Sequence, residues 1–378
     1  MSPRGALLGA ALLVPLLVGC SGSEPVLDPD LPAVEVRAVP GPSYAEQVLL
    51  GRQHLLIHVP GHTTRVDGGW EAVWRPDGSV VVLGSRWARV LDPATGEWRS
   101  GRVRIGEYGI TPEALTTLGG RRRGEGRVVV HDAALAASRK IVIPESAAES
   151  DQIDGPDAEF QLHGRPYTLG GVTFVEWGVN SESDTVTDHG LFRVEGERIT
   201  QALRNEPLVR LWPSLDGSAL LAVMQDNGED EDCGGCQVEQ KVVELDPDTG
   251  GIAADYGTPP GYTRDWRISS LDKVGRVLAV QYVVREGESG GRYQTWTYDG
   301  SWHRQAASGD TRTRFQAGGT LTWAGDTGEP NQPYDLVWHP SSGPAEVIRD
   351  RATPCPTDDT DWTACPTVSL PGSLLPLE

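Results

Sequence analysis

The sequence predicts an all-β protein, and within that class a β-propeller of seven blades, each built from four antiparallel strands. Short runs rich in Val, Leu, Thr and Trp alternate with clusters of Gly, Pro and Asp along the chain of 378 residues. The chain contains 46 Gly and 28 Pro, as a fold with many tight turns requires. One strand–turn–strand unit also recurs, and radial repetition of such units builds a propeller. Six or eight blades fit the pattern as well, and a pair of β-sandwiches is the alternative fold.

The recurring unit is clearest where its two strands flank the turn Asp-Pro-x-Thr-Gly, at residues 88–98 and 241–250. Seven units in the chain after residue 19 average about 51 residues each, which suits four short strands and their loops. The segments 99–127 and 350–378 fit the repeat poorly. Five weaker copies of the unit occupy residues 55–66, 128–143, 191–199, 293–304 and 335–348.

A second type of turn precedes some of these units, at residues 74–79, 212–218 and 272–275. The Pro-Asp-Gly-Ser turn at 76–79, together with the two Asp-Pro-x-Thr-Gly turns, resembles the turns of bacterial lipoproteins with a WD40-like or TolB-like β-propeller. The Trp-Asp dipeptide that ends true WD40 repeats is missing, so the resemblance implies the propeller fold without indicating the subfamily.

The first twenty residues read as an export signal, because Arg4 is followed by an apolar run that is too short to span a bilayer comfortably. The run ends in Leu-Val-Gly-Cys, which resembles a bacterial lipobox with Cys20 as the lipidated residue. We therefore expect a lipoprotein signal peptide at 1–19, a lipidated N-terminus and polar tether at 20–32, and one propeller domain at 33–378. This arrangement predicts an extracytoplasmic protein anchored to the cell membrane; an ordinary cleaved signal is the alternative.

The other four cysteines are expected to form disulfides, because an even number of thiols in an oxidising compartment favours pairing. Proximity in sequence suggests two bridges but does not fix the connectivity. A reactive Cys-Gly-Gly-Cys motif is disfavoured, because the acidic run 226–232 before it would raise the thiol pKa. The suggested pairs are Cys233 with Cys236 and Cys355 with Cys365.

The chain has 53 acidic and 33 basic side chains, a formal charge of −20, which argues against nucleic-acid binding. If each blade runs outward from the axis, both turn types lie on one face of the ring and the long connections lie on the other. The long connections 144–157, 178–190, 226–238, 285–292 and 325–334 contain 17 acidic residues and two Arg, and 99–127 is rich in Arg.

Long loops on a rigid scaffold often carry binding, although acidic loops also serve solubility alone. The acidic loop residues are therefore the candidate binding-face residues. They are Asp151, Asp154, Asp157, Glu182, Asp184, Asp188, Asp226, Glu229, Asp230 and Asp232.

Motifs for catalysis or metal binding are not found in the sequence. It has no Gly-x-Ser-x-Gly elbow, no phosphate-binding Gly-Lys-Ser/Thr loop and no complete EF-hand loop. On a strand, His54 and His58 would be about 13 Å apart, and only a turn at 60–61 could bring His62 back towards His58. Nine Trp and Tyr residues in 266–302 and 323–338 could stack on a sugar in the channel, but packing between blades is favoured. We predict no catalytic residue, metal or cofactor.

The sequence thus favours a membrane-anchored propeller that binds or scaffolds a protein or cell-envelope partner and performs no chemistry. The first alternative is an extracytoplasmic enzyme that acts on a glycan or uses a quinone cofactor, since propellers host both. The second alternative is a cation-binding sensor that uses the acidic loops.

Replacing the lipidated residue tests the anchor directly. Cys20→Ser should move the protein from the membrane fraction to the soluble fraction, because an acyl-anchored protein has no other predicted membrane segment. Fractionation of cells followed by immunoblotting measures this distribution, with the wild-type chain as the control. Continued membrane association of the variant would refute the anchor.

Overall fold

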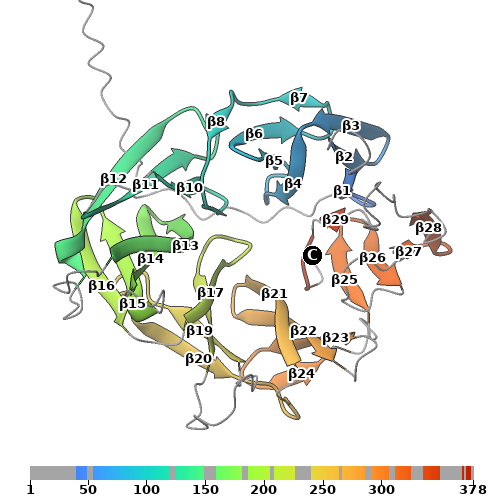
Figure 1. Cartoon of the computed structure of the whole chain (residues 1–378). Helices are drawn as coiled ribbons and strands as arrows, with labels where there is room; N and C mark the ends of the chain where they lie inside the picture. The colour runs from blue at the N-terminus through green and yellow to red at the C-terminus, as the bar shows by residue number, and fades with distance from the viewer. Residues whose placement is uncertain are drawn as a thin grey trace, which may run out of the picture.

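The ring of seven β-sheets that the sequence predicts is present in the computed structural model of the chain (Figure 1). Six of the described sheets have four strands and one has five. The sheets stand around a common axis and do not form face-to-face pairs, so the sandwich alternative is wrong. The structure describes residues 40–48, 54–119, 124–148, 159–180, 186–204, 208–225, 240–263, 266–285, 291–305, 311–324, 335–349, 368–369 and 372–375.

Each blade is one antiparallel sheet, and its strands follow one another in chain order from the axis outward. Two blades depart from this order: the inner strand of blade 1 comes from the C-terminal part of the chain, and in blade 2 the fifth strand pairs with the third. Blade 1 comprises β29 (Val368–Ser369), β1 (Tyr44–Val48), β2 (His54–Val59) and β3 (His62–Asp67); blade 2, β4 (Gly69–Trp74), β5 (Val80–Gly84), β6 (Trp87–Asp92), β7 (Glu97–Trp98) and β8 (Val103–Arg104); blade 3, β9 (Tyr108–Ile110), β10 (Ala114–Leu118), β11 (Glu125–Asp132) and β12 (Ser138–Pro144); blade 4, β13 (Glu159–Leu169), β14 (Val172–Asn180), β15 (Val186–Glu195) and β16 (Arg198–Arg204); blade 5, β17 (Leu208–Pro213), β18 (Leu220–Gln225), β19 (Gln240–Leu245) and β20 (Ile252–Gly257); blade 6, β21 (Trp266–Val274), β22 (Val277–Arg285), β23 (Gly291–Tyr298) and β24 (Trp302–Arg304); and blade 7, β25 (Arg312–Gln316), β26 (Gly319–Ala324), β27 (Asp335–Pro340) and β28 (Glu346–Arg349).

The only described helix is a short 3-10 turn, Glu145–Ala147, after β12. None of the described residues forms a helix long and apolar enough to cross a membrane.

All seven copies of the repeated unit contain the third strand of a different blade, and all but 241–250, which ends in the turn, extend into the fourth strand; this confirms the blade number. The two Asp-Pro-x-Thr-Gly turns join β6 to β7 and β19 to β20, where Gly96 and Gly250 adopt φ angles of 73° and 76°. The turn at 76–79 joins β4 to β5. Both turn types therefore lie at the same end of the ring, which we call the short-turn end, and the strand ends that flank the long connections lie at the opposite end.

The ring is closed by pairing of the two ends of the described chain. Antiparallel β29 pairs with β1 through Ala45 with Ser369 and Glu46 with Val368. After β29 the chain returns to blade 7, where Ser373 bridges to Phe315 on β25. The segment 350–378, which fits the repeat poorly, thus supplies the closing strand, and the segment 99–127 contains β8, a fifth strand of blade 2.

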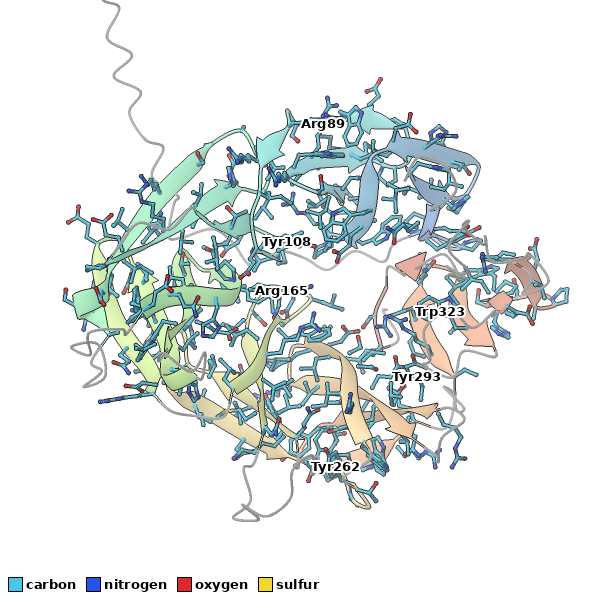
Figure 2. All side chains as sticks on the ribbon, in the orientation of Figure 1. Arg89, Tyr108, Arg165, Tyr262, Tyr293 and Trp323 are labelled. Carbon is cyan, nitrogen blue, oxygen red and sulfur yellow. The ribbon has the colours of Figure 1, made fainter. Side chains whose placement is uncertain are left out.

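The apolar core lies between neighbouring blades. One cluster joins blades 3 and 4, where Trp177 stacks on Phe192 within its own blade at a centroid distance of 5.5 Å. Another joins blades 5 and 6 around the fully buried Tyr282. Eight of the nine Trp and Tyr in 266–302 and 323–338 are described, and they are buried or pack against apolar clusters, which confirms the packing interpretation for them; Tyr293 and Trp323 are labelled in Figure 2.

Cationic side chains connect several blades at their boundaries. Arg75, after β4, donates a hydrogen bond to the carbonyl of Ala133 in blade 3. Arg193 on β15 donates to the carbonyl of Pro247 in blade 5 at 2.5 Å. Each contact holds the third-to-fourth-strand turn of one blade against the blade before it, so the boundaries are fixed by polar contacts as well as by apolar packing.

The C-terminal segment is held by a buried carboxylate of blade 6. Asp272 on β21 is 6% exposed and accepts hydrogen bonds from the backbone N–H of Leu374 and from the Ser373 hydroxyl. Burial raises the pKa of Asp272 to about 6, and the charge of Arg314 opposes the rise. Leu374 is 1% exposed and packs in a cluster with Ala279, so this segment joins blades 6 and 7.

Truncating the buried side chain of this segment should destabilise the whole ring. Leu374→Ala should lower the free energy of unfolding by about 2–5 kcal/mol, because it removes buried methyl groups and leaves a cavity. Chemical unfolding followed by tryptophan fluorescence measures the change. The matched control is Val347→Ala on the outer strand β28, where the side chain is 56% exposed and a change within about 0.5 kcal/mol is expected. Equal stability of the two variants would contradict the role of this segment.

Candidate functional site

Most residues that the sequence singled out lie outside the described residues. Asp188 is the exception, and the structure corrects its assignment to a loop. It lies on β15, is 3% exposed, and its carboxylate is 3.4 Å from the Arg204 guanidinium on β16. Its charge is therefore paired within blade 4. The residues outside the described ranges are Cys20, Cys233, Cys236, Cys355, Cys365, Asp151, Asp154, Asp157, Glu182, Asp184, Asp226, Glu229, Asp230 and Asp232.

The histidines of blade 1 do not converge on a metal site. His58 stacks on Tyr44 at a centroid distance of 4.3 Å, and its Nδ1 is 3.1 Å from the Thr63 hydroxyl. The hairpin pairs Val59 with His62, so His58 and His62 point to opposite faces of the sheet. Within the described ranges, no group of three or more His, Cys, Asp or Glu side chains could hold a metal ion.

A cavity of about 260 Å³ lies on the axis of the ring, at its short-turn end. Its walls are the innermost strands β4, β9, β13 and β17 of blades 2 to 5, together with the turns after β4, β9 and β17. Figure 2 shows two of the lining residues, Tyr108 and Arg165, on the inner side of the ring. We call this cavity the axial pocket; its polar lining includes Glu71, Tyr108, Arg165, Tyr167, Arg210 and Ser214, and its apolar lining includes Val73, Trp74, Ile110, Pro112 and Trp212.

Irregular strand pairing accompanies the charged residues of the axial pocket. The register of β4 with β5 shifts between Gly69 and Glu71, and that of β17 with β18 shifts just before Arg210. The register of β13 with β14 shifts between His163 and Tyr167, and Arg165 lies within this irregular stretch. Because an irregularity of this kind re-aims side chains, it allows successive inner strands to present charged groups to the axis.

Two of the three arginines that line the axial pocket lie against aromatic rings. The Arg165 guanidinium is 5.7 Å from the centre of the Tyr108 ring, and the Arg210 guanidinium is 4.3 Å from that of Trp212. Partial desolvation lowers the pKa of Arg210, and the positive charge of Arg165 lowers it further. Neither guanidinium has an ion-pair partner within 4.0 Å among the described residues.

The single carboxylate that lines the axial pocket is engaged by a phenol. The Tyr108 hydroxyl donates a hydrogen bond to Glu71. Burial, followed by this hydrogen bond, raises the pKa of Tyr108, so the phenol remains protonated. Burial also raises the pKa of Tyr167, and the positive charges of Arg165 and Arg210 partly offset this rise. The pocket therefore combines the guanidinium groups of Arg165 and Arg210 with two neutral phenols and one carboxylate, and Arg75 adds a third guanidinium to the lining.

A second carboxyl group lies beside the irregularity in β13. Glu176 on β14 has a side chain 13% exposed, and its carboxylate is 3.7 Å from Nδ1 of His163. Gly164, with a φ of 72°, leaves the space that this carboxylate occupies, since a Cβ there would be 2.6 Å from it. Burial, assisted by the charge of Glu107, raises the pKa of Glu176 to about 7. A carboxyl with this pKa is partly protonated at neutral pH.

A larger cavity of about 740 Å³ lies at the opposite end of the ring, between blades 2, 3 and 4. Its lining includes Arg104 and Arg127, from the arginine-rich segment that the sequence indicated, together with Arg86. The carboxylates of Glu107 and Glu125 lie in the same lining and offset much of that charge. The described lining of this cavity therefore has a mixed charge.

Sequence reasoning missed the axial pocket because it directed attention to the long loops. One signal was available: Trp74 and Trp212 both stand immediately before a turn of the second type, and both line the pocket. The charged residues themselves come from three different blades, and nothing in their local sequence indicates that they meet.

Comparisons with known proteins support the fold and nothing finer. No protein-family model matches the sequence, and no curated protein does. The β-propeller domain of the Trilobed protease from Pyrococcus furiosus is similar, with a TM-score of 0.55 and 10% identity over 85% of this chain and 99% of that one. An acylaminoacyl peptidase from Pyrococcus horikoshii has a TM-score of 0.50 and 11% identity over 79% of this chain and 48% of its own, so this chain spans about half its length. The Trilobed domain is described as having an open velcro topology, whereas here β29 closes the ring.

Removing the ionisable group at Glu176 should change how stability depends on pH. The pKa of this group rises from 4.5 to about 7 on folding, so the folded state loses up to about 3 kcal/mol relative to the unfolded state as pH rises through this interval. Glu176→Gln should therefore equal the wild type near pH 4.5 and exceed it in unfolding free energy at pH 8.

Urea unfolding at a series of pH values measures this difference. The matched control is Glu197→Gln, at an exposed position in the turn between β15 and β16, where the difference from wild type should not vary with pH. A constant difference between Glu176→Gln and wild type across the series would show that Glu176 ionises normally.

Proposed function

We propose that this protein is a membrane-tethered, extracytoplasmic propeller that binds a protein or cell-envelope partner at the short-turn end of its axis. The observation that carries the proposal is the axial pocket, where Arg165 and Arg210 lie against aromatic rings without an ion-pair partner among the described residues. Such groups gain most from an incoming anionic group, because charge-assisted hydrogen bonds are stronger than neutral ones.

The scaffold around the axial pocket supports a binding role. Its lining side chains come from strands and tight turns of four blades that pack against their neighbours. A site held by strands loses little conformational entropy when a ligand binds, so more of the contact energy appears as affinity. A rigid pocket at the end of the ring therefore suits recognition of one projecting group of a partner.

The N-terminal sequence supports the proposed location. A lipid at Cys20 and a polar tether at 20–32 would hold the ring near the membrane surface. Thirteen extended residues span at most about 45 Å, which is comparable with the diameter of a small domain. The tether thus permits the short-turn end to face a partner in the same membrane or in the adjacent envelope.

Site-specific photo-crosslinking on intact cells tests this proposal. A photoreactive amino acid in place of Leu215, which lines the axial pocket, should give a discrete adduct with one partner that mass spectrometry identifies. The matched control replaces Val142, an apolar residue 43% exposed on the outer strand β12, and should not give that adduct. Identical adducts from both positions, or none from position 215 in a protein present at the cell surface, would refute the proposal.

A further inference from the structure

We propose that the axial pocket recognises a single carboxylate group, presented by a compact organic acid or by a group of that size. This inference rests on the proposed function in taking the axial pocket as the binding site, and it adds the chemical class of the ligand.

The arrangement of the two guanidinium groups fits a carboxylate. A guanidinium is a planar fork of N–H donors that matches the two oxygens of a carboxylate, and it can stack on an aromatic face while its edge still donates. Arg165 lies over Tyr108 and Arg210 lies over Trp212, so a ring supports each fork from one side. The two forks come from adjacent blades, on β13 and β17, and line the same cavity.

The charges around the pocket indicate a monoanion. Arg165 and Arg210 contribute two positive charges, and the Glu71 carboxylate beside them contributes one negative charge. A third lining arginine, Arg75, lies near the charges of Asp77 and Asp132, which offset its own charge; its Nη1 donates to the Ala133 carbonyl, and its buried Nε and Nη2 have no hydrogen-bond partner among the described residues. One carboxylate would balance the remaining charge, whereas a phosphate dianion would exceed it by one charge and would be repelled more strongly by Glu71.

The size and walls of the pocket indicate what the acid carries. A volume of about 260 Å³ lies just below the range of about 300–1,000 Å³ that is typical of sites for drug-sized ligands. The indoles of Trp74 and Trp212 and the side chain of Ile110 supply apolar walls. A single ring that bears one carboxylate therefore fits the site better than a long chain or a polyanion.

Repulsion between the two guanidinium groups also favours binding of an anion. The charge of Arg165 already lowers the pKa of Arg210, which means that the two guanidinium groups repel each other in the pocket. A carboxylate between the two guanidinium groups would offset this repulsion, because it attracts both of them. A neutral molecule of the same shape would leave it in place.

Calorimetric titration of the full-length protein in detergent tests the inference. The probes are benzoate and glucuronate, each with a neutral counterpart, benzamide and glucose, and inorganic phosphate as the dianion. At least one of the two acids should bind with a Kd below about 10 mM and at least about tenfold more tightly than its neutral counterpart. Arg165→Gln and Arg210→Gln should each weaken that binding by about tenfold or more.

The matched control is Arg198→Gln, which makes the same charge change at an exposed position on the outer strand β16 and should leave the affinity unchanged. Circular dichroism of each variant verifies that the ring is folded. The inference is overturned if neither acid binds, if each neutral counterpart binds as well as its acid, if phosphate binds more tightly than both acids, or if the two pocket variants bind like wild type.

The two proposals fail independently. A protein that does not bind the acids but still gives the adduct from position 215 keeps its partner and loses the carboxylate specificity. A protein that binds an acid but gives no adduct keeps the pocket and loses the cellular partner.

Discussion

Pairing of β29 with β1 is the contact on which the rest of the fold depends. Each blade is a single sheet, and both of its faces must be shielded from solvent. In a closed ring, the two neighbouring blades shield them. Without the closing pair, blade 1 would lack its inner strand and the boundary with blade 7 would open. Asp272 strengthens the closure, because its buried carboxylate is satisfied by Ser373 and Leu374 of the segment that follows β29.

Closure also determines the geometry of the axial pocket. Arg165 lies in blade 4, Arg210 in blade 5 and Glu71 in blade 2. The distances between these three side chains therefore depend on every boundary from blade 2 to blade 5. Those boundaries are packed with buried apolar clusters and are further held by contacts such as that of Arg193 with Pro247. Two like charges can be kept close only by a scaffold that resists their separation, and a closed ring of packed sheets does so.

The sequence predicted what is local and missed what is distant. The turns at 92–96 and 246–250 are specified by Asp, Pro and Gly within five residues, so the third-to-fourth-strand hairpins and the number of blades could be inferred. The pairing of β29 joins residues more than 300 positions apart. The charged side chains Glu71, Arg165 and Arg210 reach the pocket from three blades, next to register shifts that no local pattern shows. Asp188 illustrates the same limit, since it is buried on a strand and its charge is paired with Arg204 on the neighbouring strand.

The acidic character of the chain and the cationic axial pocket act on an anion at different distances. A formal charge of −20 repels anions in bulk solvent, but at physiological ionic strength this repulsion is largely screened beyond about 8 Å. Inside the pocket, Arg165 and Arg210 would act at contact distance, where desolvation by Trp212 and Tyr108 reduces screening. An acid would therefore receive no long-range attraction and would be selected after entry. Recognition of this kind favours specificity over rapid capture, because the charges that discriminate act only on a ligand that already fits the walls.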